Sequence, residues 1–416
     1  MRQAILNVSL SLAVVASAAV AGEPVSPTSA VPAKVEPELA PDKELLAKIE
    51  ALPDNTWLKL PKFKVGGDIA WCGERNYNAH NMVKIGPSIR GYSGQMAWAP
   101  ERKRALYCGA NHQAPHFLND VWEYDLASNT WVCLAPPDTH FSGSAEWVKA
   151  NVVVKDGVAT TKRGGPIRPC HTWDGLCYDP ERRRLLWLDP ARGLIFGSWD
   201  KVAAGLGADL KPEDAKLKPA PWIFEFDPVA RKWDNVWTGI PDAGEACVME
   251  YLPDRKAIFL KGGTRPCGTQ LYEPEKKAWK PLSSKGQPGY GSIGAYSPDH
   301  KLVVVVDSAS TATYSLETNE WKPVQPKAPV GARDCTGVLC YDAAAKFFVL
   351  YTFQGDRKAD FLWIYDPAKN EWTDPKPGGD VPPATGAAGY YDPERNVSVF
   401  YTQSDVYIYR GRKAAK

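Results

Sequence analysis

An aromatic residue followed seven positions later by tryptophan recurs along this chain, and this spacing constrains the fold more than any other feature. The pairs are Tyr124/Trp131, Phe226/Trp233, Tyr272/Trp279, Tyr314/Trp321 and Tyr365/Trp372. A short polar turn, such as Asp-Pro-Ala-Lys-Asn at 366–370, separates the two members of each pair. Because strand side chains alternate between faces, the pattern predicts a hairpin that places both large residues on buried faces.

A second hairpin signature lies upstream of the aromatic–tryptophan pairs. It consists of an aromatic residue, a turn rich in Pro, Asp, Glu and Arg, and then an apolar run. Its copies begin at Trp98, Tyr178, Tyr251, Tyr296, Tyr341 and Tyr391. Each repeat therefore predicts four antiparallel strands, which we name a to d in chain order. Six four-stranded units around one axis form an all-β, six-bladed β-propeller.

The sixth repeat predicts how the ring closes. It ends at Tyr409 with no tryptophan after it, whereas Asn55-Thr56-Trp57 copies the Asn-Thr-Trp sequence of residues 129–131. We expect this N-terminal strand to complete the last blade. Closure of that kind removes the exposed sheet edge that an open ring would leave.

Residues 118–131 closely resemble the core of a kelch repeat, and Gly262-Gly263 resembles the kelch double glycine. The resemblance covers about residues 55 to 411 and implies a kelch-type propeller of the galactose-oxidase-like superfamily. Propellers of this kind bind proteins, bind sugars or carry enzymes. The copper enzymes among them use an adjacent Tyr-His pair, and this sequence contains no such dipeptide. The resemblance therefore does not extend to a copper-radical cofactor.

The N-terminus resembles an export signal. Arg2 precedes a short apolar stretch, and Ala19-Val20-Ala21 provides small residues at the spacing of a cleavage site. We therefore predict a signal peptide at 1–21, a Pro/Ala-rich linker at 22–41, a short amphipathic helix at 42–53 and the propeller at 54–411. The predicted location is secreted or periplasmic, without a membrane span in the mature chain.

Charge and cysteine content narrow the classes of partner. Lys and Arg total 50 against 48 for Asp and Glu, which gives a formal net charge of +2. This balance argues against a nucleic-acid-binding protein driven by bulk charge. The nine cysteines are odd in number, so at least one is unpaired within the chain. Buried thiols are the simplest interpretation, and one or two disulfides are the alternative in an oxidising compartment. We expect a monomer.

Three long insertions predict where a ligand would bind. They span 64–90, 137–168 and 189–221, in connections that share one face of a propeller, and loops on a rigid scaffold often carry binding residues. Five of the six histidines fall on the same face. We take His80, His112, His116 and His140 as candidate ligands of a divalent metal. Candidate catalytic residues are His171, Glu245 and Asp334. Histidines are also tolerated in polar loops without any such role.

Arginines on the same face indicate a ligand of negative charge. The candidate ligand-binding residues are Arg90, Arg168, Arg265 and Arg333. Arginine favours bidentate carboxylate recognition, although these side chains can instead cap carbonyls or pair with nearby acids. The predicted function is an exported propeller that binds a glycan, anionic in character, or a protein through this loop face. The alternatives are an enzyme of acidic sugars, as an epimerase or a metal-assisted polysaccharide lyase, and a structural cell-envelope protein.

Overall fold

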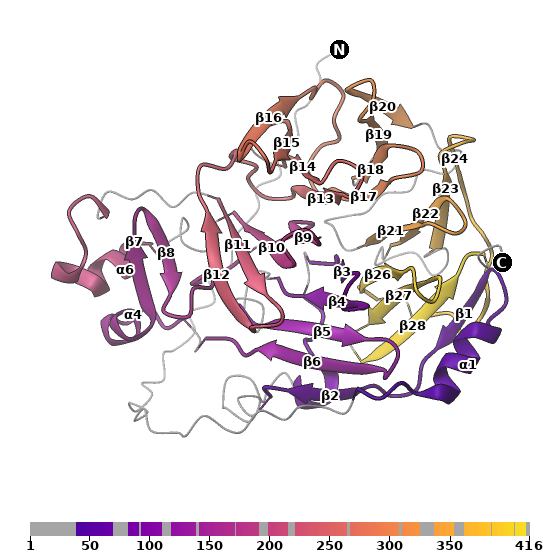
Figure 1. Ribbon diagram of the computed structural model, residues 1–416, viewed down its shortest axis with the longest axis horizontal. Helices are drawn as coiled ribbons and strands as arrows, with labels where there is room; N and C mark the ends of the chain where they lie inside the picture. Colours follow the sequence, from indigo (N-terminus) through magenta and orange to yellow (C-terminus); the bar gives the residue numbers. More distant parts are fainter. Residues whose placement is uncertain are drawn as a thin grey trace, which may run out of the picture. The chain divides into compact units, whose positions relative to one another are not determined.

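The fold is given by a computed structural model, which describes residues 39–69, 82–90, 93–109, 118–138, 141–170, 172–190, 199–214, 221–263, 267–307, 310–324, 337–352, 362–383, 385–402 and 404–412. Within these residues, six antiparallel sheets lie around a common axis (Figure 1). In five sheets the four strands of one repeat are neighbours in chain order, and in the sixth the N-terminal strand takes the fourth place; strand a is innermost in all six. The prediction of a six-bladed all-β propeller is confirmed.

The strands of the blades follow the predicted repeats. Blade one comprises β3 (Ala97–Ala99), β4 (Arg104–Tyr107), β5 (Val121–Asp125) and β6 (Thr130–Ala135). Blade two comprises β9 (Leu176–Asp179), β10 (Arg184–Asp189), β11 (Trp222–Asp227) and β12 (Lys232–Trp237). Blade three comprises β13 (Val248–Leu252), β14 (Ala257–Lys261), β15 (Thr269–Glu273) and β16 (Ala278–Leu282).

The remaining blades repeat the same order. Blade four comprises β17 (Ile293–Ser297), β18 (Leu302–Val306), β19 (Thr311–Ser315) and β20 (Glu320–Val324). Blade five comprises β21 (Val338–Asp342), β22 (Phe347–Tyr351), β23 (Leu362–Asp366) and β24 (Glu371–Thr373). Blade six comprises β26 (Ala388–Asp392), β27 (Val397–Thr402), β28 (Asp405–Arg410) and the N-terminal β1 (Thr56–Lys59).

The aromatic–tryptophan spacing sets the register of every c–d hairpin. In all six blades the two residues are direct cross-strand partners, with Tyr409 and Trp57 forming the sixth pair. Their ring centroids lie 5.0 to 5.3 Å apart, the range in which aromatic rings attract one another. In blade one the Tyr124 hydroxyl also donates to Asn129 at 2.7 Å, and Asn129 has the positive φ that the turn requires.

The ring closes as predicted. The strand β1 pairs antiparallel with β28, with Trp57 opposite Tyr409, and the short β25 (Gly378–Gly379) pairs parallel with its other edge. In Figure 1 the indigo β1 lies beside the yellow β28. Trp57 is only 2% exposed and packs against Tyr351 and Phe400. Segments from the two ends of the chain therefore share one sheet and one core.

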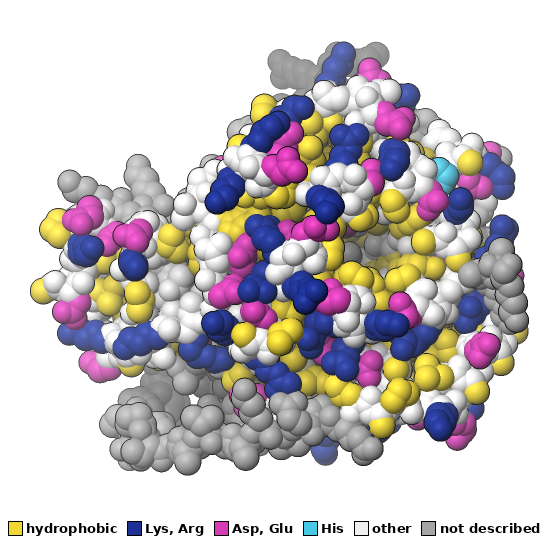
Figure 2. Space-filling view, in the orientation of Figure 1, with side chains coloured by type: hydrophobic (Ala, Val, Ile, Leu, Met, Phe, Trp, Pro, Cys, Tyr) yellow, Lys and Arg dark blue, Asp and Glu magenta, His cyan; other side chains and the backbone are white. Residues whose placement is uncertain are grey.

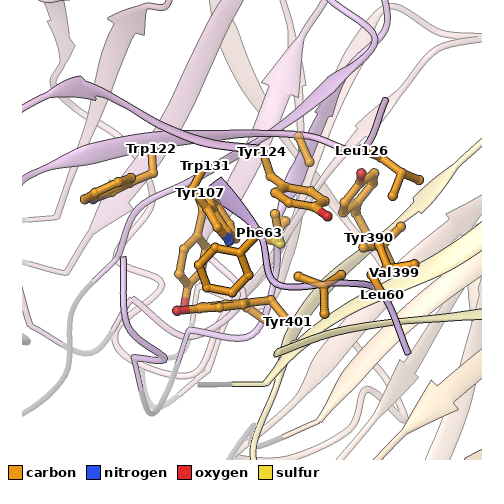
Figure 3. Packing of buried hydrophobic residues seen from close by; sticks show 14 of the residues in the cluster. Leu60, Phe63, Tyr107, Trp122, Tyr124, Leu126, Trp131, Tyr390, Val399 and Tyr401 are labelled. Atoms are coloured by element: carbon orange, nitrogen blue, oxygen red, sulfur yellow. The ribbon is translucent and has the colours of Figure 1, made fainter. Parts of the chain in front are cut away.

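The N-terminal segments also cover the junction between blades six and one. Helix α1 (Lys43–Ala51) starts at Asp42, whose carboxylate accepts from the Leu45 amide at 3.0 Å, and buries Leu45 and Ile49. The strand β2 (Lys64–Gly67) then adds to blade one, parallel to β6, and the short helix α3 (Met82–Ile85) follows. Phe63 packs on Tyr401 in the core of this junction (Figure 3).

The a–b turns connect neighbouring blades. The Tyr296 and Tyr341 hydroxyls each donate, at 2.6 Å, to an aspartate in the turn of the preceding blade, Asp254 and Asp299 respectively. Tyr178 donates to Glu101 in the same way. Lysines in the turns also form ion pairs with the turn of the preceding blade, as Lys301 does with Asp254 at 2.9 Å. The recurrent turn acid of the sequence is therefore an inter-blade contact.

Two of the long insertions pack together beside blade two. The helix α4 (Ala145–Asn151) and the hairpin of β7 (Val152–Lys155) and β8 (Val158–Thr161) belong to one insertion. The helix α6 (Trp199–Leu206), followed by the short η2 (Gly207–Asp209), belongs to another. Val148 of α4 packs so closely on Gly205 of α6 that a Cβ at 205 would lie 2.7 Å from it. Among the described helices, none is both long and apolar enough to cross a membrane.

Candidate functional site: an axial cavity

The inner strands of all six blades enclose a cavity on the propeller axis. Its volume is about 390 Å³, and β3, β9, β13, β17, β21 and β26 all contribute to its wall. The lining also includes one residue from each a–b turn: Pro100, Pro180, Pro253, Pro298, Ala343 and Pro393. The cavity therefore opens on the face that carries the a–b turns. Figure 2 shows a hollow near the middle of the drawn face with hydrophobic side chains around it.

Each blade contributes at least one aromatic residue to the cavity wall. Six of them are the first residues of the a–b signature, Trp98, Tyr178, Tyr251, Tyr296, Tyr341 and Tyr391, and blade six adds Tyr390 as a seventh. Trp98 is half-buried and stacks on Tyr390, with the ring planes 13° apart and centroids at 5.7 Å. Because the hydroxyls of Tyr178, Tyr296 and Tyr341 bond to neighbouring turns, their rings are held in fixed orientations. These three side chains are therefore oriented before any ligand arrives.

An acid lies among these aromatic residues. Glu250 of β13 is the one charged side chain among the described residues that line the cavity. Its Oε1 atom is buried and has no hydrogen-bond partner in the described structure, and the same holds for the neighbouring Tyr251 hydroxyl. Burial, reinforced by the nearby Asp174, raises the pKa of Glu250 well above its usual range.

Asp174 precedes β9 and is itself fully enclosed. Its Oδ2 atom accepts a hydrogen bond of 2.6 Å from the Gly294 amide. Burial raises its pKa to about 8, although that hydrogen bond acts in the opposite direction. Two carboxyl groups are therefore close together in a place where water solvates neither well. The pair retains protons to a higher pH than free carboxylic acids do.

The same wall contains thiols that are held in the protonated form. Cys177 and Cys340 line the cavity as free cysteines. Burial raises the pKa of both thiols, and the carboxyl group of Glu250 raises them further. Since the thiolate is the nucleophilic form, these cysteines act as apolar wall residues and not as nucleophiles.

Arg90 occupies an interior position in the structure. Its side chain is fully buried, forms an ion pair with Asp120 and donates to the Gly109 carbonyl oxygen at 2.7 Å. The Arg90 amide also lies 3.2 Å from the Tyr107 hydroxyl. These contacts correspond to the capping and pairing alternative described for the arginines, in which the guanidinium stabilises the protein itself.

Two other predicted site residues lie in the described structure. Arg168 is half-buried, with its guanidinium carbon 5.7 Å from the centre of the Phe141 ring. Glu245 is 4% exposed, and its carbonyl oxygen lies only 1.5 Å from where a Cβ at Gly263 would be placed. The close approach explains the glycine at 263, the second member of the double glycine.

The remaining predicted site residues lie outside the described residues: His80, His112, His116, His140, His171, Arg265, Arg333 and Asp334. The metal site, the catalytic candidates and the arginine cluster therefore stay predictions. Within the described ranges, no three His, Cys, Asp or Glu side chains are grouped so as to hold a metal ion.

Sequence reasoning did not assign Glu250 or Asp174 to a site. A signal for Glu250 was present: the residue directly before the inner-strand aromatic is Ala97, Cys177, Ala295 or Cys340 in four other blades. An acid at this position departs from the repeat, and the strand pattern alone does not explain it. Asp174 lies outside the repeated hairpins, so periodicity could not identify it.

The chain is a six-bladed β-propeller with an acid-bearing, aromatic-walled axial cavity. Its sequence matches no protein-family model and no curated protein. A solved auxiliary nutrient binding protein from Bacteroides thetaiotaomicron is similar over 77% of this chain and 69% of its own, with 12% identity and a TM-score of 0.41. A structure of the mitotic checkpoint complex contains a chain that is similar over 97% of this chain and 99% of its own, with 11% identity and a TM-score of 0.46. Neither similarity is close enough to assign a family or a function.

Proposed function

We propose that the protein is an exported, kelch-type β-propeller that binds a glycan in its axial cavity. The observation that carries this proposal is the set of seven aromatic residues, with at least one from each blade, around a cavity of about 390 Å³. Flat aromatic rings pack well on the C–H faces of sugars. The volume lies in the range of small-molecule pockets, in which mostly apolar walls surround a few polar groups.

The construction of the wall supports a binding role. Hydrogen bonds from Tyr296 and Tyr341 to the preceding turns fix the rings, so a ligand meets a surface that needs little ordering. Two polar atoms, the Glu250 Oε1 and the Tyr251 hydroxyl, are buried without partners in the described structure. Buried polar groups are normally satisfied, and ligand hydroxyls would satisfy these two.

Several features extend this proposal beyond the cavity. Export rests on the leader-like residues 1–21, and the kelch assignment rests on residues 118–131 and the double glycine. A second ligand contact on the loop face, anionic in preference, rests on Arg168, Arg265 and Arg333. Action on acidic sugars as an enzyme depends on His171 and the loop histidines and stays a prediction.

A glycan array probed with the chain without its predicted signal peptide, residues 1–21, tests the proposal. We expect binding to a defined set of sugars. We also expect loss of that binding in Trp98→Ala, which removes one aromatic side chain from the cavity wall. Trp279→Ala is the matched control, because Trp279 is also half-buried but lies on an outer strand away from the cavity. No binding to any glycan, or equal loss in both variants, would contradict the proposal.

A further inference from the structure

We propose that the axial cavity recognises a protonated amino group, so that its glycan ligand is an amino sugar with a free ammonium. This inference rests on the glycan-binding function proposed above and adds the chemical class of the ligand. It comes from the charge, the aromatic wall and the proton content of the cavity.

The charge of the cavity favours a cation. Among the described residues that line it there is one acid, Glu250, and no Lys, Arg or His. Lysines of the turn face are engaged elsewhere: Lys301 pairs with Asp254 at 2.9 Å and Lys256 with Glu181 at 2.9 Å. An anionic group entering this cavity would find no positively charged side chain among these lining residues.

The aromatic wall adds to the same preference. A cation is attracted to the face of an aromatic ring, most strongly where water is excluded. Hydroxyls of three wall tyrosines donate to the turn carboxylates Glu101, Asp254 and Asp299. A carboxylate that accepts from a tyrosine hydroxyl makes the ring more electron-rich and so strengthens its attraction for a cation.

The buried carboxyl pair can exchange a proton for the ligand's charge. Burial raises the pKa of Asp174 and of Glu250, so the empty cavity keeps a proton on the pair near neutral pH. The other titratable groups that face the pair are Cys177, Cys247 and Cys340, whose raised pKa values keep them neutral. When an ammonium enters, Glu250 gives up its proton to solvent and becomes the counter-ion. The cavity's net charge then stays the same, because one positive charge enters as one proton leaves.

Calorimetric titration of the chain without residues 1–21 tests the inference, with D-glucosamine, N-acetylglucosamine and cyclohexylamine as probes. Glucosamine and N-acetylglucosamine share the sugar ring, and only the first carries an ammonium. We expect glucosamine to bind at least about tenfold more tightly, as one charged hydrogen bond provides. Titration in two buffers of different ionisation enthalpy should show proton release on glucosamine binding only.

Variants locate the effect on one side chain. Glu250→Gln should weaken glucosamine binding at least about tenfold, abolish proton release and leave N-acetylglucosamine binding unchanged. It should fold normally, because glutamine resembles the protonated carboxyl group that the empty cavity already holds. Glu320→Gln, on the exposed outer strand β20, is the matched control and should change nothing.

The outcomes separate this inference from the function on which it rests. Equal binding of the two sugars, both lost in Trp98→Ala, would overturn the ammonium inference and support the glycan function. Binding of cyclohexylamine as tight as that of glucosamine would support the ammonium and overturn the glycan. Binding of none of the three would overturn both, and an unchanged Glu250→Gln would overturn the inference alone.

Discussion

Replacement of Trp57 by alanine tests how much stability the closing strand contributes. Trp57 is 2% exposed, and its ring centroid lies 5.2 Å from those of Phe400 and Tyr409 and 6.2 Å from that of Tyr351. The residue belongs to the N-terminal strand, whereas its neighbours come from blades five and six. Its loss therefore affects the contact that joins the two ends of the chain.

The expected cost is large in relation to total stability. Truncation of a buried tryptophan to alanine costs about 3–5 kcal/mol, through lost burial and the cavity left behind. Domains are stabilised by only about 5–15 kcal/mol in all, so the variant should unfold at a much lower denaturant concentration. Loss of the three aromatic contacts places the expected value in the upper part of the range.

Urea unfolding followed by circular dichroism measures this effect. The matched control is Trp279→Ala, which removes the same side chain from the same repeat position in blade three, where it is half-buried. The control should lose roughly 1–2 kcal/mol. A chain that begins at Val65 and so lacks β1 should be insoluble or strongly destabilised, whereas one that begins at Lys43 should fold. If Trp57→Ala costs no more than Trp279→Ala, the reasoning on ring closure is refuted.

Three further perturbations follow from the same contacts. Gly263→Ala should destabilise the protein by more than about 2 kcal/mol in urea unfolding, because its Cβ would lie 1.5 Å from a backbone oxygen; a neutral effect would contradict the close approach. Asp174 keeps its proton when folded up to its pKa of about 8, whereas the unfolded chain loses it near pH 4. Stability from this group is therefore greatest below about pH 4 and falls by about 1.4 kcal/mol per pH unit for each retained proton as the pH rises toward 8. Asp174→Asn should flatten the pH dependence of urea unfolding between those limits, and an unchanged slope would show that the carboxyl is solvated. Tyr296→Phe removes the 2.6 Å hydrogen bond to Asp254 and should lower the free energy of unfolding by about 1–2 kcal/mol. Thermal unfolding measures this loss, and an unchanged melting temperature would contradict the stabilising role of the hydrogen bond.

The fold was predictable from the sequence because large aromatic residues mark each repeat. A cross-strand pair such as Tyr124 and Trp131 fixes the turn length and the register together, and the displaced copy at Trp57 reveals the closure. The physical reason is that side chains of this size cannot move to the other face of a strand without exposing much apolar surface.

The site was less predictable, because its residues do not follow the repeat. Glu250 stands where four other blades have a small or thiol side chain. Its raised pKa depends on burial and on Asp174, which is 76 positions away in the sequence and close to it only once the ring forms. The buried position of Arg90 likewise depends on its pairing with Asp120 across a loop. Long insertions have no repeat partner that could fix their geometry from spacing alone.

The face on which ligand binds is the most direct test of the account. Glucosamine should be titrated into the wild-type chain, into Trp98→Ala and into Arg168→Ala, with folding checked by circular dichroism. Trp98 lines the axial cavity at the a–b turns, whereas Arg168 lies beside Phe141 in an insertion. The account predicts that binding is lost in Trp98→Ala and retained in Arg168→Ala. Retention in Trp98→Ala together with loss in Arg168→Ala would contradict it and place the site on the loop face.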